Sequence, residues 1–304
     1  MGIRRVACVG AGLVGHGWAT LFAVKGMSVN LQDFREEILA EALTKIESNV
    51  DFLAGKSVIR RGEAEVALRR IRTTTSLSEA VKDADYVQES VFESIEVKKQ
   101  VFGEMDAEAP PEAILASSSS ALLISEIQEA TTKPERCLIT HPFNPPHLIP
   151  LVELVPGNKT SPQVIKATYE FMLKLGKVPV VLKKEVPGYI ANRLSRRLYE
   201  EAVDLVDEGV ATVEDVDRAL SAGPGIRWAI MGPHLTYHLG GGPGGIEHWF
   251  DTFGQSFRPS AAKKVIEGVK EMEIVKRKSM EELVRWRDEK LVELLKIIYG
   301  IGGI

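Results

Sequence analysis

The first 33 residues contain an arrangement that few folds can accommodate. A short run rich in β-branched residues, 3–9, leads directly into Gly10-Ala-Gly12-Leu-Val-Gly15. Apolar residues then recur at helical spacing over 18–24, and a second apolar run over 27–31 ends at Asp33. This order of strand, glycine turn, helix, strand and acid is the context in which such a glycine pattern indicates a dinucleotide-binding site.

The three glycines have distinct physical roles in such a site. The first permits a tight turn, the second lets the backbone approach a pyrophosphate, and the third lets the helix pack close to its strand. The helix N-terminus then faces the phosphates, where its free N–H groups attract anions. Asp33 is placed to accept hydrogen bonds from the adenosine ribose and to repel a 2′-phosphate, so the pattern predicts NAD rather than NADP. The predicted cofactor-binding residues of this segment are Gly10, Gly12, Leu13, Val14, Gly15 and Asp33.

Strands and helices alternate as far as residue 187, and beyond it only helices and loops are indicated. The predicted strands are 71–75, 85–89, 113–116, 137–140, 151–155 and 178–182, and a helix-rich excursion covers 36–68. The predicted C-terminal helices are 189–208, 213–222, 261–276 and 279–299, with a flexible connection at Gly240 to Gly245. We therefore predict an α/β Rossmann-type NAD-binding domain over 1–187, with a doubly wound, mainly parallel sheet and a helical excursion. An all-α domain follows over 188–304.

The composition excludes several classes of partner. A formal net charge of −4 gives no sign of nucleic-acid binding, and no apolar run approaches the length of about 20 residues that a membrane span needs. Cys8 and Cys137 lie far apart without ligand-like neighbours, so neither a disulfide framework nor a metal site is indicated. These features favour a cytoplasmic protein.

Polar side chains follow two of the predicted strands. Ser117 to Ser120 come after the strand over 113–116, and His141 comes after the strand over 137–140. Ligands of open α/β sheets bind at the carboxyl ends of the strands. Histidine exchanges a proton near neutral pH, and a carboxylate on its other ring nitrogen stabilises the imidazolium. Glu153 is an acid among apolar neighbours that could serve so; the alternative is that His141 caps a turn and Glu153 ends an exposed strand.

These motifs resemble the 3-hydroxyacyl-CoA dehydrogenase family over the whole chain, and within it the lambda-crystallin branch, whose members act as L-gulonate 3-dehydrogenase. The resemblance rests on the glycine pattern with Asp33, Glu89-Ser-Val-Phe-Glu93 with Lys98, Ser117 to Ser120, His141-Pro-Phe-Asn-Pro-Pro, Pro150-Leu-Val-Glu-Leu-Val-Pro156, Lys184-Glu-Val-Pro-Gly-Tyr-Ile-Ala-Asn-Arg193 and Gly225-Ile-Arg227-Trp-Ala-Ile-Met-Gly-Pro233. It implies that His141 is the general acid/base and Glu153 its partner. It also implies that Ser120 and Asn192 bind the reacting oxygen.

The resemblance implies further cofactor contacts as well. Glu93 and Lys98 would line the cofactor groove, and Ser118 would lie near the nicotinamide. The usual family residue at that position is Asn, so this sequence departs from the pattern at Ser118. A homodimer formed through the helical C-terminal domain is also implied.

The substrate is predicted from one residue and leaves alternatives open. Arg227 follows Gly225-Ile as in the gulonate branch, and an arginine pairs well with a small carboxylate; its alternative role is a salt bridge at a domain or dimer interface. The leading prediction is NAD-dependent oxidation of the 3-hydroxyl of a small hydroxy acid, L-gulonate to 3-dehydro-L-gulonate.

Three other functions remain open at this stage. A short-chain L-3-hydroxyacyl-CoA dehydrogenase could hold a CoA phosphate with Lys56, Arg60 and Arg61. A carnitine-type 3-dehydrogenase would need aromatic walls for a quaternary ammonium, and Trp228, Tyr237 and Trp249 are available. A structural, crystallin-like role would not require a full set of catalytic-type residues.

Overall fold

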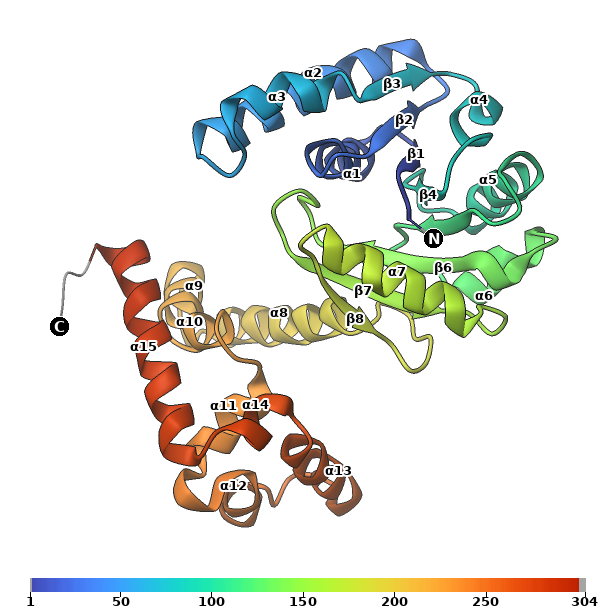
Figure 1. Cartoon of the computed structure of the whole chain (residues 1–304). Helices are drawn as coiled ribbons and strands as arrows, with labels where there is room; N and C mark the ends of the chain where they lie inside the picture. The colour runs from blue at the N-terminus through green and yellow to red at the C-terminus, as the bar shows by residue number, and fades with distance from the viewer. Residues whose placement is uncertain (1, 301–304) are drawn as a thin grey trace. The chain divides into compact units, whose positions relative to one another are not determined.

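The computed structural model describes residues 2–300 and shows two compact units, Met1–Arg197 and Leu198–Ile304 (Figure 1). The first unit contains a sheet with helices on it, and the second consists of helices. Both predicted fold classes, the Rossmann-type α/β unit and the all-α unit, are confirmed. The contacts divide the chain inside helix α8, Ala191–Asp207, whereas the domain boundary after residue 187 stays a prediction. None of the helices among residues 2–300 is both long and apolar enough to span a membrane.

The sheet of the first unit has eight strands in the order β3-β2-β1-β4-β5-β6-β7-β8. The strands are β1 (Arg5–Val9), β2 (Ser28–Gln32), β3 (Ile71–Thr74), β4 (Tyr86–Glu89), β5 (Ile114–Ser117), β6 (Cys137–Pro142), β7 (Leu151–Pro156) and β8 (Val178–Val181). All neighbouring strands are parallel except β6 and β7, which are antiparallel. The chain runs outward from β1 to β3 and then returns to β4 on the other side of β1. This reversal opens a crevice at the carboxyl ends of β1 and β4, where ligands bind in such sheets.

Helices cover both faces of the sheet, and strand β1 supplies apolar side chains to both faces. The helices of this unit are α1 (Leu13–Val24), α2 (Glu36–Gly55), α3 (Arg61–Leu68), α4 (Leu77–Val81), α5 (Ile95–Glu108), α6 (Ile124–Ile127) and α7 (Pro162–Lys174). Successive side chains of a strand point to opposite faces. Val6 and Cys8 accordingly pack into the cluster that contains α1, α2 and α7, whereas Ala7 and Val9 pack into the cluster that contains α4, α5 and α6. Burial on both faces explains why β1 is a continuous apolar run.

The glycine turn between β1 and α1 is tight. Gly10 has φ +92°, a conformation that side-chain-bearing residues rarely adopt, and its N–H donates to the carbonyl of Gln32 over 2.8 Å. A Cβ on Gly15 would lie 1.8 Å from the carbonyl oxygen of Gly10, so only glycine lets α1 start this close to the turn. A Cβ on Gly12 would meet no atom within 4 Å, so the backbone there borders open space.

Helix α8 starts later than the sequence suggests. A helix was predicted from Tyr189, but Gly188 and Tyr189 both have positive φ, 73° and 50°, and the helix starts at Ala191. The Tyr189 side chain is fully buried, and its hydroxyl donates to the carbonyl of Leu122 over 2.8 Å. This tertiary anchor holds a left-handed turn that local helix propensity does not favour.

The second unit departs from the prediction in two places. The helix predicted over 261–276 is two helices, because Met272 adopts an extended conformation between them. The glycine run, predicted as a flexible connection, forms a close turn between packed helices: a Cβ on Gly241 would lie 1.8 Å from the carbonyl oxygen of Gly245. The helices that follow α8 are α9 (Val213–Ala222), α10 (Pro224–Trp228), α11 (Pro233–Gly240), α12 (Gly245–Phe253), α13 (Pro259–Lys270), α14 (Glu273–Arg277) and α15 (Met280–Tyr299).

The two glycines at the start of α1 differ in what a methyl group would meet, and this difference can be tested by substitution. Gly15→Ala should lower the free energy of unfolding by about 1–3 kcal/mol, because the new Cβ overlaps the Gly10 carbonyl. Intrinsic helix propensity alone would favour alanine by about 1 kcal/mol. Gly12→Ala is the matched control and should change stability little, since its Cβ meets open space. Urea denaturation of both variants checks the prediction, and equal stability would contradict it.

Candidate active site

A pocket of about 380 Å³ opens at the carboxyl edge of the sheet. Its walls come from α1, the ends of β4, β5 and β6, and the first turn of α8. It brings together seven residues that the sequence singled out: Val14, Glu93, Lys98, Ser118, Ser120, His141 and Asn192. A larger pocket of about 590 Å³ lies in the second unit between α12 and α13 and contains none of the predicted residues.

The pairing of β6 with β7 places the two central residues side by side. His141 stands directly opposite Glu153 in the antiparallel register, and side chains in such a pair share one face of the sheet. The Nδ1 atom of His141 lies 2.8 Å from Oε2 of Glu153. Both side chains are buried, at 6% and 1% exposure, so neither belongs to an exposed turn or strand end.

The second oxygen of Glu153 is held by the turn before α8. The N–H groups of Ile190 and Ala191 donate to Oε1 over 2.8 and 3.0 Å. Burial by itself raises the pKa of Glu153, but the hydrogen bonds from His141 and these two N–H groups lower it below its ordinary value. The carboxylate is therefore ionised at neutral pH and can only accept. His141 must then carry a proton on Nδ1, which leaves Nε2 as the basic nitrogen.

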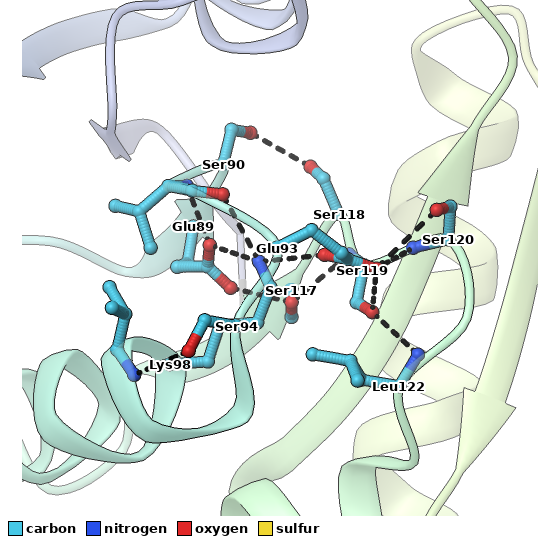
Figure 2. Close-up of polar contacts among 12 residues, drawn as sticks. Glu89, Ser90, Glu93, Ser94, Lys98, Ser117, Ser118, Ser119, Ser120 and Leu122 are labelled. Carbon is cyan, nitrogen blue, oxygen red and sulfur yellow. Dashed lines mark hydrogen bonds and ion pairs between the residues drawn. The ribbon is translucent and has the colours of Figure 1, made fainter.

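A buried ion pair closes the other wall. Nζ of Lys98 lies 2.6 Å from Oε1 of Glu89, and the two side chains are 1% and 0% exposed. Glu89 also accepts from the Val91 N–H over 2.6 Å and from the Ser117 hydroxyl over 2.5 Å (Figure 2). Sequence reasoning assigned no role to Glu89; an acid at the end of a buried strand, followed by a lysine in the next helix, was the available signal.

Glu93 organises the serine loop. Its Oε1 accepts from the Ser119 hydroxyl over 2.7 Å, from the Ser120 N–H over 2.8 Å and from the Ala121 N–H over 3.2 Å (Figure 2). Burial raises the pKa of Glu93, but the Ser119 hydrogen bond and the charge of Lys98 lower it below its ordinary value. The loop is thus fixed by a carboxylate that stays charged. Asn192 adds a link from α8, because its Nδ2 donates to the Ser120 carbonyl over 3.3 Å.

The glycine turn and Asp33 form an adjoining cradle. Oδ2 of Asp33 accepts from the Ala11 N–H over 2.8 Å, and Oδ1 accepts from the Phe34 N–H over 2.9 Å. The open space beside Gly12 leaves room for a group to approach the backbone where α1 begins. These residues fit a dinucleotide: a helix N-terminus for the pyrophosphate and a carboxylate for a ribose.

Arg227 belongs to the other unit. It lies exposed on α10 beside Trp228, and Tyr237 and Trp249 pack with ring centroids 4.5 Å apart on α11 and α12. The predicted substrate contact of Arg227 stays a prediction.

Two neighbouring lysines provide a test of the buried ion pair. Lys98→Met should destabilise the protein by about 3–5 kcal/mol, because it leaves the Glu89 carboxylate buried without its partner. Lys99 pairs with Glu129 at the surface, where both side chains are more than a third exposed, so Lys99→Met should cost less than about 1 kcal/mol. Urea unfolding of both variants compares them. A similar small loss for both would show that the buried pair is dispensable.

Two family models cover most of the chain. The NAD-binding domain of 3-hydroxyacyl-CoA dehydrogenase matches residues 5–186, and the C-terminal domain of the same family matches residues 188–286. L-carnitine dehydrogenase of Streptomyces coelicolor is 38% identical over 311 residues, which cover 99% of this chain and 96% of that protein. L-carnitine dehydrogenase of Streptomyces griseus is 41% identical over 255 residues, covering 84% and 75%.

A solved structure agrees with these matches. FadB2 of M. tuberculosis superposes with a TM-score of 0.71 at 31% identity, covering 89% of this chain and 95% of that one. The chain therefore belongs to the 3-hydroxyacyl-CoA dehydrogenase family and is an NAD-dependent oxidoreductase that acts on a hydroxyl group.

Proposed function

We propose that this protein oxidises the 3-hydroxyl of a small 3-hydroxy acid that carries a quaternary ammonium, with L-carnitine as the substrate. The His141–Glu153 pair on the pocket supports the chemistry, because it is an oriented base in reach of a bound hydroxyl. The names of the relatives, L-carnitine dehydrogenases similar over nearly the whole chain, support the substrate.

The proposed reaction begins at Nε2 of His141. This nitrogen takes the hydroxyl proton of the substrate, while Glu153 stabilises the imidazolium that forms. The cradle formed by the glycine turn and Asp33 would hold NAD, which would supply the acceptor for the hydride on the same carbon. Glu153 keeps its charge during the transfer because the N–H groups of Ile190 and Ala191 compensate it from the other side.

Further residues complete the proposed site. Ser120 and Asn192 line the pocket near His141 and would donate hydrogen bonds to the reacting oxygen. Asp33 would hold the adenosine ribose and exclude a 2′-phosphate. Glu93, Lys98 and Ser118 would shape the nicotinamide end of the cofactor groove.

The two ends of L-carnitine suggest roles for the second unit. A carboxylate pairs well with a guanidinium through two parallel hydrogen bonds, which is the role proposed for Arg227. A quaternary ammonium binds the face of an aromatic ring. Trp228 follows Arg227 directly on α10 and is 39% exposed, so both groups are available on one short helix.

The comparisons favour carnitine over the gulonate substrate that the sequence motifs first suggested. None of the similar proteins named above carries a gulonate activity in its name. The CoA alternative relied on Lys56, Arg60 and Arg61. Arg60 is already engaged, since its Nη2 and Nε lie 2.5 and 3.0 Å from Oε1 of Glu63 at the start of α3.

We also propose that the protein is a cytoplasmic homodimer. Helix α8 and the loop after it expose apolar side chains in the second unit, among them Leu198, Tyr199, Val203 and Val210. A second copy of this unit would remove them from water. Cys8 and Cys137 are buried free thiols, which suits a reducing compartment.

A substrate panel tests the proposed function. NADH formation should show the highest kcat/KM with L-carnitine, well above 3-hydroxybutyrate, which has the same reacting group but no ammonium. A cation–π contact is worth about 0.5–2 kcal/mol, which corresponds to a preference of about 2- to 30-fold. Higher kcat/KM with L-gulonate or L-3-hydroxybutyryl-CoA would overturn the carnitine proposal and leave the family assignment intact.

The base can be tested separately from the substrate. His141→Ala should lower kcat by about 10²–10⁴-fold, because general acid–base catalysis contributes that much. NADH binding to the free enzyme should change little. His248, an exposed residue of α12, provides the control His248→Ala, for which normal turnover is expected. Near-normal kcat in His141→Ala would show that another group takes the proton.

A further inference from the structure

A chain of hydrogen bonds runs from the core of the first unit to the wall of the active-site pocket. Its members are Tyr86, Thr140, Gln88, Trp18, Ser118 and Ser90. The first four are completely buried, whereas Ser118 and Ser90 line the pocket. Of these six residues, only Ser118 has a role in the site proposed above.

The side-chain amide of Gln88 sets which groups donate and which accept along this chain of hydrogen bonds. Its Oε1 accepts from the hydroxyls of Tyr86 and Thr140, each over 2.8 Å. The amide nitrogen therefore faces the other way and donates to Oγ of Ser118 over 2.8 Å. Because these groups are buried, reversing the amide would require both hydroxyls to turn as well.

The hydrogen bonds that Ser118 accepts decide that its own hydroxyl donates to Ser90. The indole N–H of Trp18 also donates to Oγ of Ser118, over 3.2 Å. A hydroxyl has two lone pairs and one proton, and amide and indole N–H groups only donate. Both lone pairs of Ser118 are thus in use, and its proton goes to Oγ of Ser90, 2.8 Å away (Figure 2).

Ser90 accepts this bond and keeps its own proton for another acceptor. Among residues 2–300 its hydroxyl has no partner besides Ser118. Ser90 follows the end of β4 and packs against the glycine turn, since a Cβ on Gly10 would lie 2.7 Å from its carbonyl group. Ser90 therefore borders both the glycine turn and the pocket that contains His141.

We propose that Ser90 donates a hydrogen bond to an acceptor oxygen of the molecule bound in this pocket. Gln88 and Trp18 make Ser90 the donor, because both donate to Ser118, which in turn donates to Ser90. Its place beside the glycine turn favours an oxygen on the nicotinamide half of NAD, and an oxygen of the hydroxy acid has the same chemistry. The inference needs NAD binding and does not depend on which hydroxy acid is oxidised.

Ser90→Ala tests the contact. The Kd for NADH, measured by fluorescence titration without substrate, should rise by about 3- to 10-fold, the typical worth of one hydrogen bond. Ser90→Thr keeps the hydroxyl and should restore binding, and Ser48→Ala on the exposed side of α2 is the control. A change confined to the KM for the hydroxy acid would assign the acceptor to the substrate. Unchanged Kd and KM would overturn the proposal.

The direction of donation has its own test. The analogue 3-acetylpyridine adenine dinucleotide keeps the ring carbonyl of NAD but lacks its amide N–H. If Ser90 donates, Ser90→Ala should weaken the analogue and NAD by the same factor. An effect that disappears with the analogue would mean that Ser90 accepts, and the proposed polarity would be wrong.

A double-mutant cycle tests the role of Trp18. Trp18→Phe keeps a ring but removes the indole N–H, which frees one lone pair of Ser118. It should raise the Kd for NADH in the wild-type background but not in Ser90→Ala, because the effect passes through Ser90. Equal increases in both backgrounds would show that Trp18 acts only through packing, and would remove it from the proposal.

Discussion

The carboxylate of Glu153 on β7 connects His141 on β6 with the start of α8 at the candidate active site. One oxygen faces His141 across the β6–β7 pair, and the other accepts from the N–H groups of Ile190 and Ala191 at the start of α8. A buried charge is costly unless hydrogen bonds satisfy it. Here that requirement fixes the tautomer of His141 and the point after β8 at which helix α8 begins. Loss of this acid would disturb the orientation of His141 and the start of α8 together.

Acids that accept hydrogen bonds from backbone N–H groups recur along the carboxyl edge of the sheet. Each of four acids there accepts hydrogen bonds from backbone N–H groups of a neighbouring loop: Asp33 from Ala11 and Phe34, Glu89 from Val91, Glu93 from Ser120 and Ala121, and Glu153 from Ile190 and Ala191. Loops at this edge carry the ligand-binding groups but cannot use the sheet ladder to satisfy their own N–H groups. These acids solve both problems, because their hydrogen bonds order the loops and leave defined positions for a cofactor. Loops that such hydrogen bonds order before a ligand arrives lose less entropy on binding.

The residues proposed for the chemistry and those proposed for substrate choice belong to different units of the chain. The base, its partner acid and the serine loop all belong to the first unit, where their distances are set by the sheet. The groups proposed for the two ends of the hydroxy acid, Arg227 and Trp228, belong to the second. Under these proposals, substitutions in the helical unit would change the substrate without disturbing the proton transfer.

The sequence by itself determined the glycine turn, the alternation of strands and helices and the candidates His141, Glu153, Glu93 and Lys98, because these depend on local periodicity and residue chemistry. It could not determine which side chains meet. That His141 faces Glu153 follows from an antiparallel register, that Lys98 pairs with Glu89 follows from burial, and that α8 starts at Ala191 follows from the anchoring of Tyr189 in the core. The hydrogen-bond chain that ends at Ser90 also joins residues distant in sequence, so no local pattern reveals it. Only the tertiary structure decides such contacts, because a hydrogen bond depends on distance in space.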